Sequence, residues 1–317
     1  MYLRKDATSS SQIEGTMATM MDAIEAEVRT NMNIPQDVDD ILHYIQALNY
    51  GMERVREDGF PITLRFIREL HEKLMSSARA SHFADPGNFR TSQNWIGGTR
   101  PDNARFVPPP PVEMQRALDD LEKFFHTEDD ILEIIKAGII HAQFETIHPF
   151  LDGNGRVGRM LISFYLWKAG LLEKPILFLS SYFRKHQALY YEKISAYHNG
   201  GISDWILFFI EGVIEIAEEA VWMVEKITEL KERDFAKIRL FGKRASESAH
   251  FVLPKLYAHP VVNVSLIREW TGFSAPGAQM VIDRFMEVGI LSPKNKDGKY
   301  GQSYVYKEYI DIFDSFK

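Results

Sequence analysis

Two apolar helical stretches joined by a short glycine-rich loop constrain the fold of this chain more than any other feature. The first, ILEIIKAGIIHAQFET at 131–146, is apolar nearly all round, which is typical of a helix buried at the centre of a domain. The second, VGRMLISFYLWKAG at 157–170, is similarly apolar, and the loop HPFLDGNGR at 148–156 separates the two. The pattern predicts two central helices with a strongly polar loop between them.

The rest of the chain also indicates a mainly α protein. Helical spacing predicts helices over 36–57 and 63–79, a helix from about 112 with Pro111 in its first turn, and further helices to about residue 247. A stripe of apolar residues predicts one N-terminal helix, on which lie Ile13, Met17, Met20, Ile24 and Val28. The Gly-, Pro- and Asn-rich segment 83–111 predicts an excursion that contains a short hairpin.

Length and composition exclude several classes of function. The chain has 317 residues, which suggests about two domains. A net charge of −7 argues against a protein that mainly coats nucleic acid or an anionic membrane. The absence of cysteine excludes disulfides, thiolate zinc sites and cysteine nucleophiles. Apolar runs such as 205–210 are too short to span a bilayer and the N-terminus lacks a signal-peptide core, so we expect a soluble, cytoplasmic protein with no membrane partner.

The loop at 148–156 combines residue types that suit a nucleotide site. Gly153 and Gly155 allow the chain to turn sharply, and the backbone N–H groups at the start of the next helix form an anion cradle. Arg156 and Arg159, three residues apart on one helix face, suit a polyphosphate. An aspartate follows in the loop, Asp152, whose oxygen atoms are ligands that Mg²⁺ prefers.

The loop also contains a base. His148 is the group nearby whose unperturbed pKa, about 6.5, allows it to accept a proton near neutrality. Taken singly, a Gly-Asn-Gly turn or a histidine is usually structural, and the chain has no Walker-type phosphate loop. The combination in one loop favours a nucleotide site over coincidence.

The stretch HPFLDGNGRVGR at 148–159 resembles the signature of the Fic family, and the resemblance extends over roughly residues 8–200. It implies a Fic-type helical bundle and an enzyme that transfers AMP from ATP to a hydroxyl group of a protein. It further implies that His148 is the general base and that Asp152 holds Mg²⁺. By the same resemblance, Gly153, Asn154 and Gly155 make the anion hole, Arg156 binds the β-phosphate and Arg159 binds the γ-phosphate.

Departures within the family affect the chemistry that we expect. The phosphate-transferring Doc-like relatives carry a lysine where this chain has Gly155, which makes phosphotransfer a weaker expectation. Transfer of UMP or phosphocholine stays open, because the loop holds the phosphates of the donor and does not contact its nucleobase. The resemblance also implies that an additional N-terminal segment, common in the family, is short or absent here.

Two further segments resemble parts of Fic proteins. The stretch at 87–98 resembles the flap, a hairpin that holds a target segment by main-chain pairing; its residues are Arg90, Thr91, Ser92, Gln93, Asn94, Trp95, Ile96 and Gly97. A second motif, formed by Ser10, Glu14 and Gly15, matches the inhibitory helix, whose glutamate would pair with Arg159. Read without the family, Ser11 and Glu14 instead predict a capping box at the start of a helix.

The C-terminal part resembles a winged helix-turn-helix, with helices at about 264–270 and 275–288 followed by a two-stranded wing. Residues 250–317 have eight Lys or Arg and seven Asp or Glu, so their net charge is only +1. The one local basic cluster is formed by Lys294, Lys296 and Lys299. Weak DNA binding through 264–307 and a protein-docking role both stay open.

We therefore expect three regions: an inhibitory-helix region at 1–35, a Fic catalytic domain at 36–248 and a winged helix-turn-helix at 249–317. The leading hypothesis is an autoinhibited protein adenylyltransferase that uses ATP and Mg²⁺ and modifies an unidentified target protein or itself. Alternatives are a DNA-binding regulator with a nucleotide-sensing Fic domain, and an enzyme in which Glu14 positions water to remove AMP. A homodimer also stays open.

Overall fold

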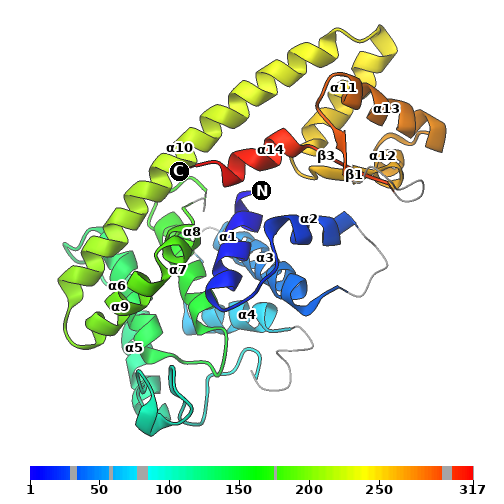
Figure 1. Ribbon diagram of the computed structural model, residues 1–317. Coiled ribbons are helices and arrows are strands. Elements are labelled where there is room, and N and C mark those ends of the chain that lie inside the picture. Colours follow the sequence, from blue (N-terminus) through cyan, green and yellow to red (C-terminus); the bar gives the residue numbers. More distant parts are fainter. Residues whose placement is uncertain (29–33, 57–59, 77–84, 175–176, 295–301, 317) are drawn as a thin grey trace. The chain divides into compact units, whose positions relative to one another are not determined.

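The computed structural model of the chain describes residues 1–28, 34–56, 60–76, 85–174, 177–294 and 302–316 (Figure 1). Most of the described residues are helical, and the strands among them form one small three-stranded sheet. This confirms the expected fold class. The chain forms two compact units, a larger one of Tyr2–Thr19 and Pro35–Ala217, and a smaller one of Met1, Met20–Ile34 and Glu218–Lys317. The expected regions 1–35, 36–248 and 249–317 stay a prediction.

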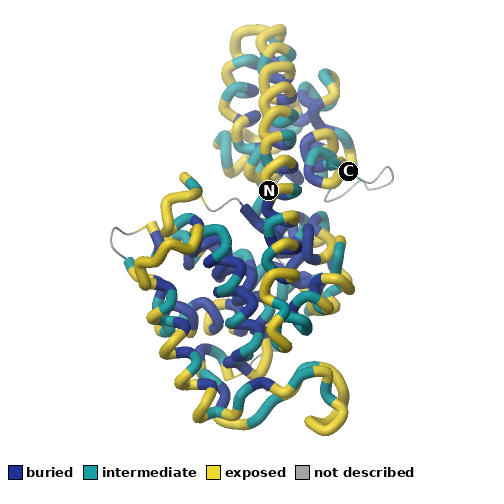
Figure 2. The backbone as a smooth tube through the Cα atoms, turned by 90° about the vertical axis from the view of Figure 1, so that its left-hand side faces the viewer, coloured by how far each residue is buried: buried dark blue, intermediate teal, exposed yellow. Residues whose placement is uncertain are grey.

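The larger unit is a bundle of helices around α7 (Asn154–Lys168). Its partners in the bundle include α1 (Tyr2–Ile13), α3 (Gln36–Arg56), α4 (Leu64–Leu74) and α6 (Glu133–Ile147), and α5 (Pro111–His126) and α9 (Gln187–His198) pack on α6. The unit also contains η2 (Pro101–Asn103), α8 (Ser180–Lys185) and the first part of α10 (Ile202–Arg239). Helix α7 is buried over most of its length. Figure 2 shows buried stretches of the chain in dark blue inside the bundle. The two apolar stretches are therefore central, as predicted.

The central helices meet at a sharply turned loop. Helix α6 ends at Ile147. His148 caps it in a left-handed conformation (φ 49°), and its N–H still bonds the carbonyl of Phe144 at 2.9 Å. The proline that follows predicts an extended His148. That expectation is wrong, because the left-handed conformation allows the residue to cap the helix and to turn the chain at once. Helix α7 then begins at Asn154, directly after Gly153 (φ 80°).

The N-terminal segment differs from the single helix expected over 13–28. Helix α1 ends at Ile13, residues 14–19 are not helical, and α2 (Met20–Val28) follows as a separate helix. Gly15 (φ 96°) ends α1, with its N–H bonded to the carbonyl of Gln12 at 3.1 Å. The capping box is therefore wrong, because Ser11 lies in the last turn of a helix and not at the start of one. A glycine in this conformation just past the last helical residue is a common helix stop.

The segment at 85–110 connects α4 to α5 without forming a regular hairpin. One antiparallel bridge joins Ile96 to Phe106, and no strand ladder is present in the described part of this segment. The expected hairpin at 87–98 is thus reduced to a loop that closes at a single residue pair. Gly97 and Gly98, both with positive φ, turn the chain just after the bridge.

The smaller unit contains the elements expected near the C-terminus. Two helices, α12 (Val264–Thr271) and α13 (Ala275–Glu287), are joined at Gly272 in a left-handed conformation. Three antiparallel strands have the order β1-β3-β2, with β1 at Val261–Asn263, β2 at Ser292–Pro293 and β3 at Ser303–Val305. Also in this unit are α11 (Lys243–Leu256), α14 (Lys307–Asp311) and η3 (Ile312–Asp314).

A role of these elements in DNA binding stays a prediction. Of the three wing lysines, Lys294 forms an ion pair with Glu25 of α2. Lys296 and Lys299 lie outside the described residues. Within the ranges that are described, no helix has both the length and the apolar character needed to cross a membrane.

Candidate active site

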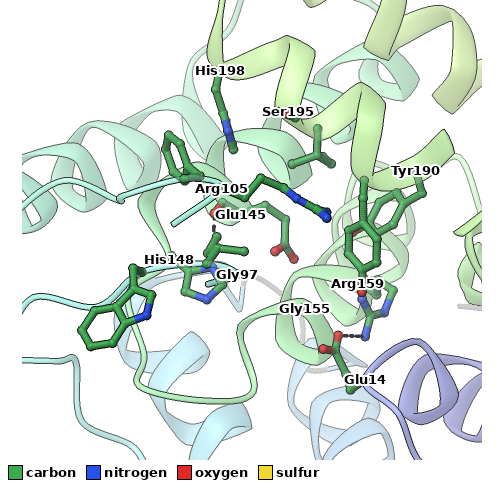
Figure 3. Close-up of a pocket in the computed structure, with 15 residues that line it drawn as sticks. Glu14, Gly97, Arg105, Glu145, His148, Gly155, Arg159, Tyr190, Ser195 and His198 are labelled. Carbon is green, nitrogen blue, oxygen red and sulfur yellow. Dashed lines mark hydrogen bonds and ion pairs between the residues drawn. The ribbon is translucent and has the colours of Figure 1, made fainter. Parts of the chain in front are cut away.

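His148 lies where α6 meets the loop, and its side chain lines a cavity (Figure 3). Its ring Nδ1 is 3.3 Å from the carbonyl oxygen of Glu145. Because a carbonyl oxygen can only accept, Nδ1 carries the hydrogen and Nε2 keeps a free lone pair. Burial lowers the pKa of His148 to about 4, so the ring is neutral near pH 7 and able to accept a proton.

The loop that follows His148 is held by side chains inside the bundle. Phe150 is fully buried and stacks on His71 of α4, with ring centroids 3.7 Å apart. Asn154 bonds the backbone N–H and carbonyl of Phe150 with its amide, both at 2.8 Å. His71 accepts a hydrogen bond from the N–H of Gly87 at Nδ1, and its Nε2 therefore donates to the carbonyl of Asp152 at 3.0 Å. These contacts fix the backbone of the loop, and they occupy the Asn154 side chain that was expected in an anion hole.

The start of α7 brings cationic and acidic groups together. Asp152 has an exposed side chain, and its Oδ1 accepts from the N–H of Gly153 at 2.6 Å. The guanidinium of Arg156 is buried, and its Nη2 lies 3.5 Å from both Asp152 Oδ1 and Met75 Sδ. Arg156 Nε has no hydrogen-bond partner among the described residues. The arginine is thus only loosely held, at a helix N-terminus that favours anions.

Arg159 is held by the segment that ends α1. Its Nη2 donates to Glu14 Oε1 at 2.6 Å and to the carbonyl of Ser10 at 3.0 Å, and its Nε donates to Ser10 Oγ at 2.8 Å. Burial alone would lower the pKa of Arg159, but the charge of Glu14 and its other neighbours raises it. Gly155 makes this pair sterically feasible, because a Cβ there would lie 2.3 Å from Glu14 Oε1.

The cavity next to these groups has a volume of about 400 Å³. Charged and small residues form one end, where Glu14, Gly155 and Arg159 meet (Figure 3). The other end is largely aromatic and aliphatic. The remaining lining residues of the whole cavity are Trp95, Ile96, Gly97, Arg105, Phe106, Glu145, His148, Tyr190, Tyr191, Ile194, Ser195 and His198.

The predicted site residues divide into two groups in the structure. Seven of them line the cavity: Glu14, Trp95, Ile96, Gly97, His148, Gly155 and Arg159. The others are outside its lining, and they are Ser10, Gly15, Arg90, Thr91, Ser92, Gln93, Asn94, Asp152, Gly153, Asn154 and Arg156. Several of these hold the lining residues in place, as Ser10 does for Arg159.

Arg90 shows this supporting role most clearly. Its side chain is buried, and it donates to the carbonyl of His148 at 2.9 Å and to the carbonyl of Ser92 at 3.0 Å. It also donates to the carbonyl of Pro109, so it ties both ends of the 85–110 segment to the loop. Asn94 adds a bond from Nδ2 to the carbonyl of Phe150 at 3.1 Å. Arg90 was expected in a target-binding flap, yet all these bonds are internal.

Several residues of the site were not predicted from the sequence. His71 supports the loop from 81 residues away, and no local pattern marks it. Tyr190 and His198 come from α9, which has no signature of its own. Glu145 had a detectable signal, because it is an acid in a helix that is otherwise apolar nearly all round.

A divalent ion would have few protein ligands here. Among the residues described, no three His, Asp or Glu side chains are close enough together to enclose a metal ion. Asp152 offers one exposed carboxylate beside the helix N-terminus. A single carboxylate fits Mg²⁺ that takes its other ligands from phosphates and water, which is a common arrangement at phosphate-transfer sites.

Comparison with known proteins finds similar sequences. The chain is 28% identical over 205 residues to a protein adenylyltransferase Fic of Nematostella vectensis, which covers 63% of this chain and 44% of that protein. It is 26% identical over 245 residues to a probable protein adenylyltransferase of Aquifex aeolicus, covering 75% and 62% respectively. The chain thus spans less than two thirds of the length of these relatives.

Solved structures show the same fold. A crystal structure of a Fic family protein from Desulfovibrio desulfuricans G20 matches 96% of this chain and 86% of that chain, with a TM-score of 0.58 and 19% identity. The sequence profile of the Fic/DOC family matches residues 61–166, and the Fic/DOC family N-terminal profile matches residues 1–53. The chain belongs to the Fic/DOC family.

Proposed function

We propose that the chain is a protein adenylyltransferase that transfers AMP from ATP to a hydroxyl group of a protein. One observation carries the proposal: a neutral histidine with a free Nε2 lone pair lines a cavity that ends at a helix N-terminus and a buried arginine. The names of the relatives support the same reaction. The modified protein is either a separate target or the chain itself.

In the proposed reaction, His148 Nε2 takes the proton of the attacking hydroxyl. The oxygen forms a bond to the α-phosphorus of ATP while the bond to the bridging oxygen breaks, and pyrophosphate leaves. The N–H groups at the start of α7 and the side chain of Arg156 stabilise the charge on the phosphates. Arg159 orients the γ-phosphate. A Mg²⁺ ion held by Asp152 and the phosphates would neutralise further charge on the nucleotide.

The proposed enzyme is autoinhibited by Glu14. The carboxylate of Glu14 is 2.6 Å from Arg159 and occupies the end of the cavity that is assigned to the γ-phosphate. A triphosphate would place negative charge at the same point, so the two compete for one guanidinium. Removal of Glu14 would therefore allow ATP to bind in a productive pose.

Labelled ATP tests the proposal. Purified wild type, Glu14→Gly, His148→Ala and the double variant Glu14→Gly/His148→Ala are incubated with ATP labelled on the α-phosphate, with and without cell lysate. We expect Glu14→Gly to label itself or a target more strongly than wild type. Removal of the general base in the Glu14→Gly background is expected to reduce labelling roughly 10²–10⁴-fold. Equal labelling by all variants would contradict the assignment.

One control variant and two further reactions make the result specific. Glu128→Gly removes an exposed acid from a surface loop outside the cavity and should leave labelling at the wild-type level. Parallel reactions with labelled UTP and CDP-choline test the alternative donors. Incubation with a target that already carries AMP tests whether the enzyme works in the removing direction.

A further inference from the structure

The cavity contains a buried acid that neither the proposed transfer step nor the inhibitory pair uses. Glu145 lies on α6, three residues before His148, and it is 8% exposed. Its Oε1 has no hydrogen-bond partner among the described residues. Proteins seldom leave a buried polar atom without a partner, and such atoms often mark a functional site. Because Glu145 lines the cavity, its carboxyl group is able to hydrogen-bond a ligand there.

The position of Glu145 indicates which part of a nucleotide it would meet. Its carboxyl group points into the cavity between the charged end at Arg159 and the aromatic end near His198 (Figure 3). A nucleotide with its phosphates at Arg159 would place its base among the aromatic and aliphatic residues. The sugar lies between phosphates and base, so its hydroxyl groups would face Glu145.

Close packing holds the carboxyl group in this position. A Cβ on Gly158 of α7 would lie 2.8 Å from Glu145 Oε1, so the backbone of α7 closes one side of the acid. His141, one turn earlier on α6, is engaged with Tyr190 at 2.9 Å. Oε1 is thus the oxygen on the α7 side, and the residue lines the cavity with the rest of its carboxyl group.

The surroundings favour an acid that is uncharged near neutrality. Burial raises the pKa of Glu145 to about 7, with Glu14 raising it and Arg159 lowering it. The titratable and charged groups around the acid are His141 and His148 on α6, Arg159 on α7, Glu14 after α1, Tyr190 and Tyr191 on α9, and Arg105 of the 85–110 segment. A protonated carboxyl group can donate and accept hydrogen bonds, and it does not repel a triphosphate.

We propose that Glu145 is a positioning residue for the nucleotide and that its carboxyl group hydrogen-bonds a ribose hydroxyl of ATP. The inference rests on the proposed function, since it requires ATP in this cavity. The acid would align the sugar, and through it the α-phosphorus, with the attacking oxygen at His148. It would also make the site select ribonucleotides over the matching deoxynucleotide.

Binding measurements with three nucleotides test the inference. The full chain carrying Glu14→Gly is titrated with ATP, 2′-deoxy-ATP and 3′-deoxy-ATP, and dissociation constants are measured by calorimetry. We expect one deoxynucleotide to bind about 3- to 10-fold more weakly than ATP, which corresponds to one hydrogen bond. Adding Glu145→Ala should weaken ATP to the level of that deoxynucleotide and abolish the difference. Glu145→Gln should retain part of it, because an amide also donates and accepts.

The controls separate positioning from a structural role. Gln143→Ala changes the same helix at a residue bonded to Tyr197, outside the cavity lining, and should leave all three constants unchanged. A structural role for Glu145 would lower the melting temperature and weaken all three nucleotides equally in Glu145→Ala, and that result would overturn the inference. Equal binding of the three nucleotides by the Glu14→Gly chain, in which Glu145 is intact, would also overturn the inference. If none of the nucleotides binds to the Glu14→Gly chain, the proposed function itself fails.

Discussion

The guanidinium of Arg159 is held by both the side chain and the backbone of Ser10 as well as by Glu14. Three polar atoms from one short segment thus hold the guanidinium of this arginine. Since these bonds involve a charged donor in a buried setting, each is stronger than an ordinary neutral hydrogen bond. The proposed inhibition would therefore depend on more than the one carboxylate of the sequence motif.

Ser10→Ala should activate the enzyme partly. The variant removes the bond from Arg159 Nε to Ser10 Oγ and leaves the bond to Glu14 in place. A hydrogen bond to a charged group contributes about 1.5–3 kcal/mol. We therefore expect self-labelling with ATP to lie between that of wild type and that of Glu14→Gly. Ser11→Ala is the matched control, because Ser11 Oγ is buried without a hydrogen-bond partner among the described residues. Equal activation by both serine variants would contradict the assigned role of Ser10.

The pH dependence of transfer should reflect the unusual histidine. The pKa of His148 is lowered to about 4 from an ordinary 6.5, so the ring stays neutral, and able to accept a proton, at pH values where an ordinary histidine is charged. We expect the kcat of Glu14→Gly, measured at saturating ATP, to show no effect of His148 protonation between pH 6 and 8. It should fall only as the pH approaches 4. A half-maximal rate near pH 6.5 would instead indicate an exposed, ordinary imidazole.

At the residue scale, sequence reasoning found the groups that lie close together in the chain and missed those that folding brings in. His148 and Arg159 share one loop and helix, so their joint chemistry could be predicted from their spacing. His71 and Glu145 could not be assigned in this way. The role of His71 depends on a bond to Asp152, 81 residues away. That of Glu145 depends on its place in the cavity lining and on an Oε1 without a hydrogen-bond partner among the described residues.

At the scale of elements, helix ends position the site. Helix α1 ends at Ile13 and α6 ends at Ile147. In both cases a left-handed residue just past the end, Gly15 or His148, turns the chain. Helix periodicity predicted α6 and α7 well, because an apolar helix needs no information about its neighbours. It failed for the N-terminal helix, where the apolar stripe continues across the break at Gly15 and the helix stop was overlooked.

Arg90 should be essential for the order of the 85–110 segment. Arg90→Ala removes the buried guanidinium that donates to the carbonyls of His148, Ser92 and Pro109. We expect a loss of about 2–4 kcal/mol in the free energy of unfolding, together with reduced transfer, because the backbone of His148 is released. Chemical denaturation measures the first effect and ATP labelling the second. Arg90→Lys should rescue little, since an ammonium cannot reproduce the planar fork.

Thr91→Ala provides the matched control for that experiment. It changes the next residue along the chain, whose side chain is exposed and outside the cavity lining. Its free energy of unfolding should stay within about 0.5 kcal/mol of wild type. If Arg90→Ala were as mild as Thr91→Ala, the arginine would not be the anchor of the segment.

For the whole molecule, the sequence predicted the order of the elements better than their grouping. The mainly α class and the C-terminal helix pair followed from periodicity and turn residues, which act locally. The grouping depends on which apolar faces meet. Met20–Ile34 belongs to the same compact unit as Glu218–Lys317, although some two hundred residues separate them in the chain. Nothing in the local pattern of α2 indicates its contact with β1.

Buried histidines should make the stability of the protein fall in acid. Burial lowers the pKa of His71 and His148 to about 4 and that of His141 to about 3, whereas each would titrate near 6.5 in the unfolded chain. Below pH 6.5 the unfolded chain therefore binds protons that the folded chain does not, and stability is lost as the pH falls toward 4. Glu145 acts in the opposite sense, because its pKa is raised to about 7 and the folded chain binds its proton more tightly. The three histidines together outweigh this one acid.

Thermal unfolding between pH 7 and pH 4.5 checks this balance. Each net proton taken up on unfolding lowers the free energy of unfolding by about 1.4 kcal/mol per pH unit, so the melting temperature should fall progressively below pH 6.5. His141→Phe should reduce the slope, since an aromatic ring can pack between Phe183 and Trp205 without titrating. Glu145→Gln should steepen it, because the opposing group is removed. A melting temperature that is constant or rises on acidification would mean that these histidines are solvated and charged in the folded protein.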